Sequence, residues 1–325
     1  MSIATNLQKL ETDITNAYDA VQTKGGTIPT DKNTNNLATA ISSISGGGDI
    51  DWSEIGYSGT PQTIIDSFNY AKQISDNWDS SRTNYSYYFE NNTNLIYMPL
   101  VDTSKGTSFT YMFKGCSNLQ IIPKLNTTNG TGFNGMFQLC TQLKTIPQID
   151  TSNGTKFSSM FRECENLIEI PQIDTSKGTS FYTTFDSCKK LKTIPPLNTS
   201  NITSFYGMFW NCYNLETIPE LDSHKVVELS YFLEGIGATL KNLGGFLNLG
   251  EAYLTTQSAN YSSYTLDLNY KNNITHDSLM NVINKLYDIA TKGCNTQGLK
   301  LGSTNLAKLT AEEIGTATNK GWSVS

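Results

Sequence analysis

The chain carries little charge and almost no histidine, and both shortages exclude classes of function. Only 16% of its 325 residues are charged, the formal net charge is −6, and no cluster of Lys and Arg occurs. Nucleic acid is therefore not an expected partner, because phosphate binding needs clustered cations. The two histidines, His224 and His276, have no motif-spaced Ser, Cys or Asp partner, and no phosphate-binding loop motif occurs. We expect neither enzymatic activity nor a cofactor.

Long hydrophobic runs and closely paired cysteines are absent as well. No apolar run approaches the roughly 18 residues of a membrane span, and the N-terminal segment lacks the apolar core of a signal peptide. We therefore expect neither membrane insertion nor export. The six cysteines include no Cys-x-x-Cys pair, so no metal site is predicted. Five of them recur at a fixed spacing in which side chains run parallel, which suits buried free thiols better than disulfides.

The dominant feature is a unit of 24 residues that is written six times between Asn94 and Gly237. One unit cannot bury its own apolar side. We call the residues at the same position of successive units a column, and when the units stack, each apolar column becomes a continuous ladder of buried side chains. In each unit, Leu-x-x-Ile-Pro predicts a short strand ended by proline, and Asp/Asn-Thr-Ser predicts a turn. The repeated columns include Leu95, Leu119, Leu143, Leu167, Leu191 and Leu215; Phe109, Phe133, Phe157, Phe181 and Phe205; Phe113, Phe137, Phe161, Phe185 and Phe209; and Cys116, Cys140, Cys164, Cys188 and Cys212.

The consensus of these units resembles a known repeat family. Residues Leu143 to Cys164 read Leu-Lys-Thr-Ile-Pro-Gln-Ile-Asp-Thr-Ser-Asn-Gly-Thr-Lys-Phe-Ser-Ser-Met-Phe-Arg-Glu-Cys. This pattern resembles the BspA-type leucine-rich repeat, a right-handed solenoid found in bacterial surface adhesins and in proteins of phages. The resemblance covers about 144 residues and implies a binding scaffold, but it names no ligand.

Residues 1–45 form a separate helical module by pattern, followed by a glycine hinge at 46–50. The module is either a docking or oligomerising element or a helical hairpin packed on its own domain, and the glycine run favours the first. Lys24-Gly-Gly-Thr-Ile-Pro and Asn36-Leu-Ala-Thr-Ala-Ile resemble segments of phage structural proteins from low-GC Gram-positive bacteria, which implies attachment to a virion. Apolar residues of the predicted a/d heptad seam are Ile3, Leu7, Leu10, Ile14 and Val21.

The segments that flank the repeats are predicted to close the two ends of the stack. Residues 51–93 are expected to form an N-terminal cap with a degenerate first turn, in which Ile74 aligns with Met98 and Trp52 and Trp78 cover the open end. Residues 238–325 are expected to form longer strand–helix repeats as a C-terminal cap. One helix should start near Thr275 and another at Thr310, with Trp322 as a lid.

Two surfaces are candidates for ligand binding. Large aromatic residues replace polar or small ones at four positions of neighbouring units, which fits sugar stacking or protein contact, or alternatively packing against the C-terminal cap or a sister subunit. These residues are Tyr182, Tyr206, Trp210 and Tyr213. The strand-facing positions vary from copy to copy and form the second surface, with Lys144, Gln148, Glu169, Gln172 and Lys192. The Asp column could in principle hold Ca²⁺, but the following Thr-Ser favours turn bonding.

The predicted fold class is α/β, a solenoid of 24-residue leucine-rich repeats with parallel strands, an N-terminal helical module and a larger-repeat C-terminal cap. The predicted function is a non-enzymatic phage virion protein of the tail, baseplate or fibre, assembled in the host cytoplasm. Its partners would be itself, as a homo-oligomer such as a trimer, other virion proteins through residues 1–45, and a host-surface glycan or protein. Alternatives are a structural virion protein without a receptor and a bacterial surface adhesin.

Overall fold

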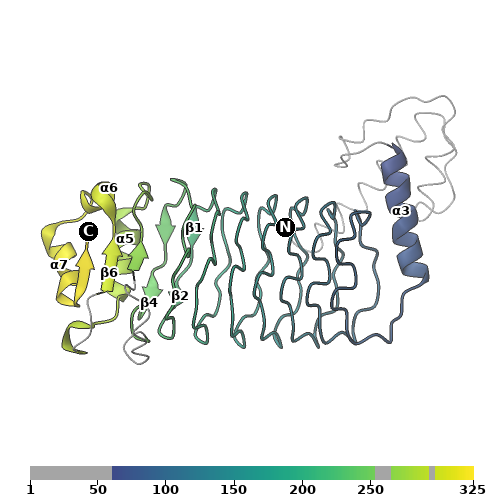
Figure 1. The fold of residues 1–325 in the computed structure, drawn as a ribbon, viewed down its shortest axis with the longest axis horizontal. Helices are drawn as coiled ribbons and strands as arrows, with labels where there is room; N and C mark the ends of the chain where they lie inside the picture. The colour runs from purple at the N-terminus through teal and green to yellow at the C-terminus, as the bar shows by residue number, and fades with distance from the viewer. Residues whose placement is uncertain (1–60, 253–264, 293–296) are drawn as a thin grey trace.

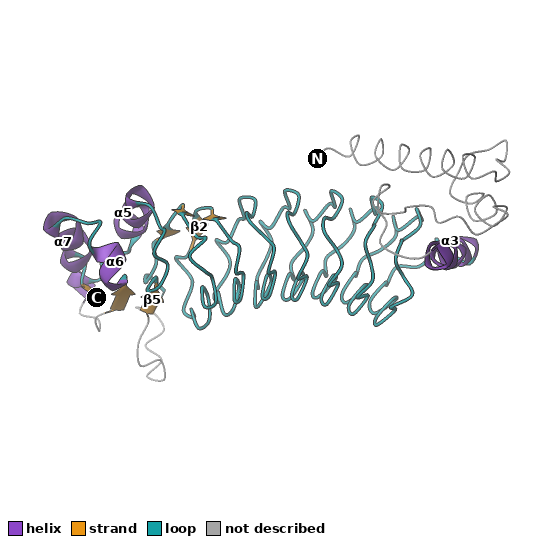
Figure 2. Ribbon diagram, turned by 90° about the horizontal axis from the view of Figure 1, so that it is seen from above, coloured by secondary structure: helices purple, strands orange, loops and turns teal. Residues whose placement is uncertain are grey.

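The structure is a computed structural model that describes residues 61–252, 265–292 and 297–325. The described chain forms an elongated row of turns, with a helix at one end and a small region of helices and strands at the other (Figure 1). Seen at right angles, the successive turns lie side by side along the long axis (Figure 2). The predicted seam residues Ile3, Leu7, Leu10, Ile14 and Val21, the hinge 46–50, Trp52 and Cys294 lie outside the described residues.

Two ladders of phenylalanine rings form the core of the stacked turns and confirm the 24-residue register. Phe133 stacks on Phe157 at a ring-centroid distance of 5.8 Å, and Phe137 stacks on Phe161 at 5.7 Å. All these rings are fully buried. Since a ring at the same place in the next turn completes each contact, the apolar side of one turn becomes buried only by its neighbours.

Backbone bonds between neighbouring turns hold the segment that carries these rings. The chain passes twice per turn through the left-handed region, for example at Tyr111 (φ 57°) and Gly115 (φ 74°). The Tyr111 N–H donates to Asn134 O at 2.8 Å, and the Gly115 N–H donates to Gln138 O at 2.8 Å. A non-glycine residue in this conformation is strained, so the bonds to the next turn offset the strain.

Polar groups inside the turns are bonded in the same repeating manner. The Thr151 hydroxyl donates to Asp174 O in the next turn at 2.8 Å, and the Cys164 thiol donates to Phe137 O at 2.9 Å. The five described cysteines are free and buried, as predicted. Burial raises the pKa of the Cys116 thiol to about 12. The thiols are thus inert donors to the core backbone and not only small apolar groups.

The predicted short strands are parallel, and in most turns they are reduced to a single bridge. The Leu-x-x-Ile-Pro segments pair through isolated bridges such as Tyr97↔Ile121, and extended pairing begins only with β1 (Thr217–Ile218) and β2 (Leu221–Asp222). These strands pair in parallel with β3 (Asn242–Leu243) and β4 (Phe246–Leu247), respectively. The proline that follows each bridge lacks an N–H, so a ladder cannot continue through it.

The N-terminal end of the stack is covered by aromatic rings, and the predicted degenerate first turn is present, with one residue aligned wrongly. Trp78 stacks on Tyr85 at 5.4 Å, and Tyr85 stacks on Phe109 at 5.6 Å. Ile74, which was expected to align with Met98, instead lies in helix α3 (Pro61–Asp76) and packs against the core from there. Its alignment with the strand column is therefore wrong, because the helical segment places Ile74 on a turn of helix.

The C-terminal region is a three-stranded parallel sheet with helices. Its strands are β5 (Thr265–Asp267), β6 (Gln297–Lys300) and β7 (Trp322–Val324), in the order β5-β6-β7. The helices are α5 (His276–Lys285), the 3₁₀-helix η1 (Ala290–Lys292), α6 (Gly302–Leu306) and α7 (Ala311–Asn319). The described residues thus combine helices with short parallel strands.

The predicted helix starts in this region are confirmed, whereas α6 was not expected. The Thr275 hydroxyl accepts from the Ser278 N–H at the start of α5, and Thr310 forms a capping box with Glu313 at the start of α7. Trp322 is buried, and its indole N–H donates to Tyr287 O at 3.0 Å.

Candidate ligand-binding surface

Four aromatic side chains form a continuous strip over three neighbouring turns. Tyr182 stacks on Tyr206 with a centroid distance of 4.7 Å and an interplanar angle of 5°. Tyr231 meets Tyr206 edge to face at 5.3 Å and stacks on Trp210 at 4.7 Å. We call Tyr182, Tyr206, Trp210 and Tyr231 the aromatic strip. Tyr182 and Tyr231 are 46% and 40% exposed, so the two outer rings of the strip are accessible from solvent.

The structure brings three of the four predicted aromatic residues together and adds one that was missed. Tyr213 is not part of these ring contacts; its hydroxyl donates to Asn211 Oδ1 at 3.3 Å instead. Tyr231 was overlooked because the sixth repeat loses most of its consensus. It lies in the same column as Tyr87 and Tyr111, which also contact each other at 5.1 Å, and extending that column would have found it.

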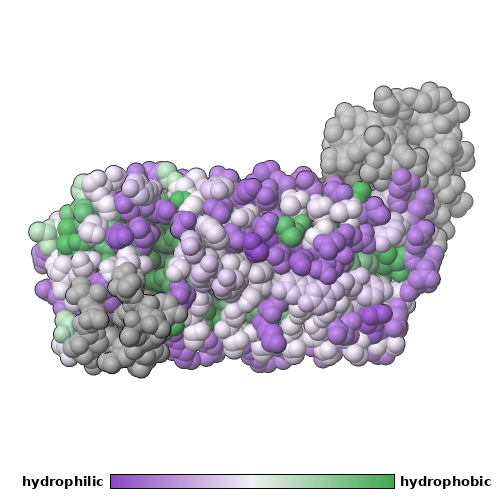
Figure 3. Space-filling view, in the orientation of Figure 1, coloured by the Kyte–Doolittle hydropathy of each residue, from purple (hydrophilic) through white to green (hydrophobic). Residues whose placement is uncertain are grey.

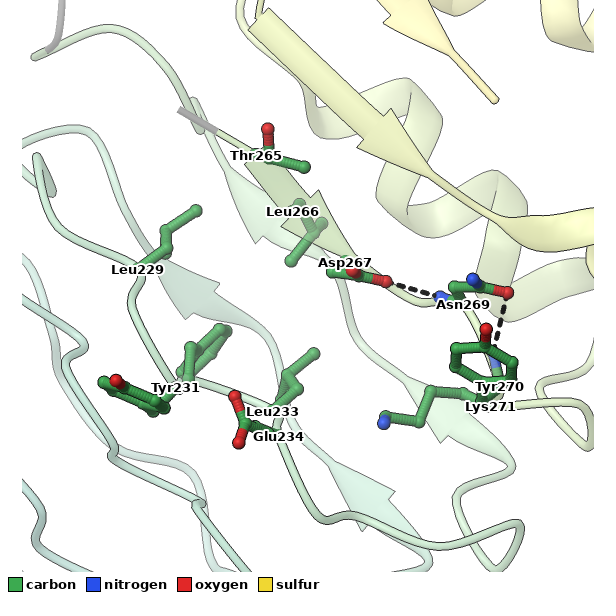
Figure 4. Close-up of a pocket in the computed structure, with 11 residues that line it drawn as sticks. Leu229, Tyr231, Leu233, Glu234, Thr265, Leu266, Asp267, Asn269, Tyr270 and Lys271 are labelled. Atoms are coloured by element: carbon green, nitrogen blue, oxygen red, sulfur yellow. Dashed lines mark hydrogen bonds between the residues drawn. The ribbon is translucent and has the colours of Figure 1, made fainter. Parts of the chain in front are cut away.

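A pocket of about 200 Å³ lies at the C-terminal end of the aromatic strip, where the last 24-residue turn meets the sheet. Figure 4 shows Tyr231 and Glu234 on the turn, opposite Asp267 on strand β5 and Lys271 in the loop that follows. The buried side chains of Phe232, Leu233 and Leu266 also line it, as do Leu229, Thr265, Asn269 and Tyr270. Tyr231 belongs to both features, so strip and pocket form one surface.

The strand-facing candidates lie on a different surface and have partly structural roles. The Gln148 side chain donates to Gln172 O at 2.6 Å, and the Gln172 side chain donates to Pro196 O at 2.8 Å. Both amides therefore link neighbouring turns. Lys192 lies 3.9 Å from the Glu216 carboxylate. Lys144 and Glu169 are exposed. In Figure 3, the stacked turns are mainly hydrophilic on the face drawn, with hydrophobic residues in small separate spots.

The histidines and acidic residues take part in local bonding. His224 Nδ1 lies 2.6 Å from Asp222 Oδ1 within one turn. His276 Nε2 lies 2.8 Å from Glu313 Oε1, and this contact joins α5 to α7. The Asp150 carboxylate accepts from the Ser152 hydroxyl and N–H, which lower its pKa. Within residues 61–252, 265–292 and 297–325, no group of three His, Cys, Asp or Glu side chains is arranged to hold a metal.

Comparison with known protein families identifies the family of this chain. The sequence matches the family described as "Mycoplasma protein of unknown function, DUF285" over residues 62–169 and 141–246, which together span more than half of the chain. DUF285 is a family of BspA-like repeats, and the chain belongs to it. No curated protein matches the sequence.

Solved structures show a weak likeness to this chain. A T. pallidum leucine-rich repeat protein (TpLRR), solved by crystallography, is 14% identical, and the match covers 70% of this chain and 84% of that chain at a TM-score of 0.31.

None of the helices among the described residues has the length and apolar character to span a bilayer.

Proposed function

We propose that this chain is a non-catalytic recognition protein, a BspA-type leucine-rich-repeat solenoid that binds a host cell surface as part of a phage virion. The observation that carries the proposal is the aromatic strip, in which four large rings gather on the outside of three turns. Aromatic rings on protein surfaces gain from covering the apolar faces of sugars or of protein side chains. The rigid stack holds these rings in place, which reduces the entropy lost on binding.

The proposed virion setting rests on a resemblance of the N-terminal sequence. Residues 1–45 resemble N-terminal segments of phage structural proteins, and Ile3, Leu7, Leu10, Ile14 and Val21 repeat at heptad spacing. A self-associating or docking module of this kind would present several copies of the aromatic strip together. Multivalent presentation raises the overall affinity through effective concentration, without any new contact at each site. Weak single contacts could then serve stable attachment.

The test is binding of the fluorescently labelled full chain to intact candidate host cells. The double variant Tyr182→Ala/Tyr206→Ala removes one stacked ring pair of the aromatic strip. The matched control is Tyr87→Ala/Tyr111→Ala, which removes a ring pair 5.1 Å apart at the other end of the stack. We expect saturable binding that the first variant weakens at least about ten-fold and that the control leaves unchanged.

The other outcomes separate the alternatives. If both variants bind as well as the parent, the aromatic strip is not the binding surface and the strand-facing residues Lys144, Gln148, Glu169, Gln172 and Lys192 become the site to test. If the full chain binds no cells at any concentration, the receptor-binding role is refuted and a structural role in the virion is favoured. Detection on the surface of a bacterium that carries no phage would favour an adhesin.

A further inference from the structure

Lys271 has a largely buried side chain, but its ammonium forms none of the bonds seen for comparable lysines nearby. The residue is 8% exposed, and no hydrogen bond or ion pair to its Nζ forms within the residues that the structure describes. By contrast, Lys308 Nζ donates to Asn272 O at 2.6 Å and Ile274 O at 2.7 Å, and Lys320 Nζ donates to Asn284 O at 2.7 Å. Among the described residues, Gln297 Oε1 is the fully buried side-chain polar atom that lacks a partner. The Lys271 Nζ therefore reaches open space at the end of a buried side chain, and its N–H groups can donate to a ligand there.

The Lys271 side chain lines the pocket at the end of the aromatic strip and points across it towards the turn that carries Glu234 (Figure 4). Burial lowers the pKa of the Lys271 ammonium, and the Asp267 and Glu234 carboxylates oppose this shift. Asp267 accepts from the Asn269 N–H at 2.9 Å, which fixes its orientation. The pocket therefore presents a donor and two acceptors around one space, and Tyr231 lies at its edge beside the aromatic strip.

These groups indicate the charge of the ligand that fits. An anion such as a phosphate or a uronate would meet the Asp267 and Glu234 carboxylates, whereas a cation would meet the Lys271 ammonium. An uncharged ligand that both donates and accepts hydrogen bonds suits all three groups, and hydroxyl groups do both. The volume of about 200 Å³ has room for one sugar ring.

We propose that this pocket binds a single uncharged sugar unit, with the Lys271 ammonium donating to its hydroxyl or ring oxygens and Tyr231 covering its apolar face. Carboxylates, an amine donor and an aromatic wall around a ring-sized space supply the contacts that a polyhydroxylated ring needs. The inference rests on the proposed function and names its ligand class: the sugar unit would be the end of a surface glycan that continues along the aromatic strip.

The experiment is saturation-transfer NMR followed by titration of the full chain with the methyl glycosides of glucose, galactose and N-acetylglucosamine. Glucuronate and glucosamine serve as the anionic and cationic probes. At least one neutral glycoside should bind, more tightly than either charged sugar. Lys271→Met keeps the apolar stem and should weaken that binding at least about ten-fold. Lys300→Met is the matched control, since Lys300 lies 4.0 Å from Asp267 but does not line the pocket; it should change the affinity by less than about two-fold.

A second variant protects the test against misfolding. Glu234→Gln keeps the shape of an exposed side chain and should also weaken the binding of neutral glycosides, while its thermal unfolding stays at the parent value. Binding of none of the three glycosides, tighter binding of glucuronate, or equal effects of Lys271→Met and Lys300→Met would each overturn the inference. Cell binding lost in Tyr182→Ala/Tyr206→Ala but kept in Lys271→Met would leave the proposed function standing and remove only the pocket.

Discussion

Coupling between neighbouring rings of the phenylalanine ladder can be measured directly. Phe137 and Phe161 are fully buried, and their rings stack at 5.7 Å with an interplanar angle of 13°. Each also stacks on a ring of its other neighbour, Phe113 or Phe185. The perturbation is replacement by leucine, alone and in pairs, because leucine keeps an apolar side chain in the core but removes the ring stacking.

The expected magnitudes follow from the volume and the ring stacking that each replacement removes. Each single Phe→Leu replacement should lower the free energy of unfolding by about 1–3 kcal/mol, because the core is left less well filled and the ring no longer stacks on either neighbour. In Phe137→Leu/Phe161→Leu, both replacements remove the same shared stacking interaction. The double variant should therefore be less destabilised than the sum of the singles by about 0.5–1.5 kcal/mol. Phe113→Leu/Phe185→Leu, whose two positions are not neighbours in the ladder, should be additive within about 0.5 kcal/mol.

The assay is urea unfolding of the full chain, followed by circular dichroism and analysed as a double-mutant cycle. The slope of free energy against urea must stay constant across the variants, because a change in slope would signal uncoupled unfolding of part of the stack. If the neighbouring pair is as additive as the distant pair, ring stacking does not couple the turns. The ladder would then stabilise through area burial alone.

Three further predictions follow from single contacts. In urea unfolding, Gly154→Ala should lower the free energy of unfolding by about 1–3 kcal/mol, since the added Cβ would lie 2.5 Å from Phe157 Cζ. Gly315→Ala in helix α7 meets nothing within 4 Å and should raise the free energy of unfolding by about 0.5–1 kcal/mol. The reverse order of the two variants would contradict the packing. At most one of the six thiols should react with a disulfide reagent at neutral pH before denaturant is added, because five are buried, and rapid reaction of two or more would show that the turns open. The bond to Glu313 raises the pKa of His276. The stability that this contact contributes is therefore present below about pH 6.5 and is lost as the pH rises through the raised pKa. His276→Ala should lower the melting temperature at about pH 5.5 and not at about pH 9, and an equal loss at both pH values would refute the charged contact.

The sequence alone determined the repeating part of the fold. A 24-residue period places Phe137 and Phe161, or Cys140 and Cys164, at equivalent points of neighbouring turns, and stacking is the arrangement that buries every column at once. The same logic found Tyr182 above Tyr206, because equal offsets within a repeat become contacts between repeats. Local capping chemistry likewise fixed the start of α7 at Thr310, since a capping box depends only on residues three apart.

Only the tertiary structure decided what happens where the period ends. The pocket brings Glu234 of the last 24-residue turn together with Asp267 of strand β5 and Lys271 of the following loop. The C-terminal region does not share the 24-residue period, so equal spacing in the sequence does not relate these residues. Ile74 lies 24 residues before Met98, which is the spacing of a strand residue, but it belongs to helix α3. At the end of the stack, local helix formation outweighs the 24-residue spacing. The Gln148 and Gln172 amides, which looked free to bind a ligand, are used between turns, since a side-chain amide beside a backbone carbonyl finds its partner there first.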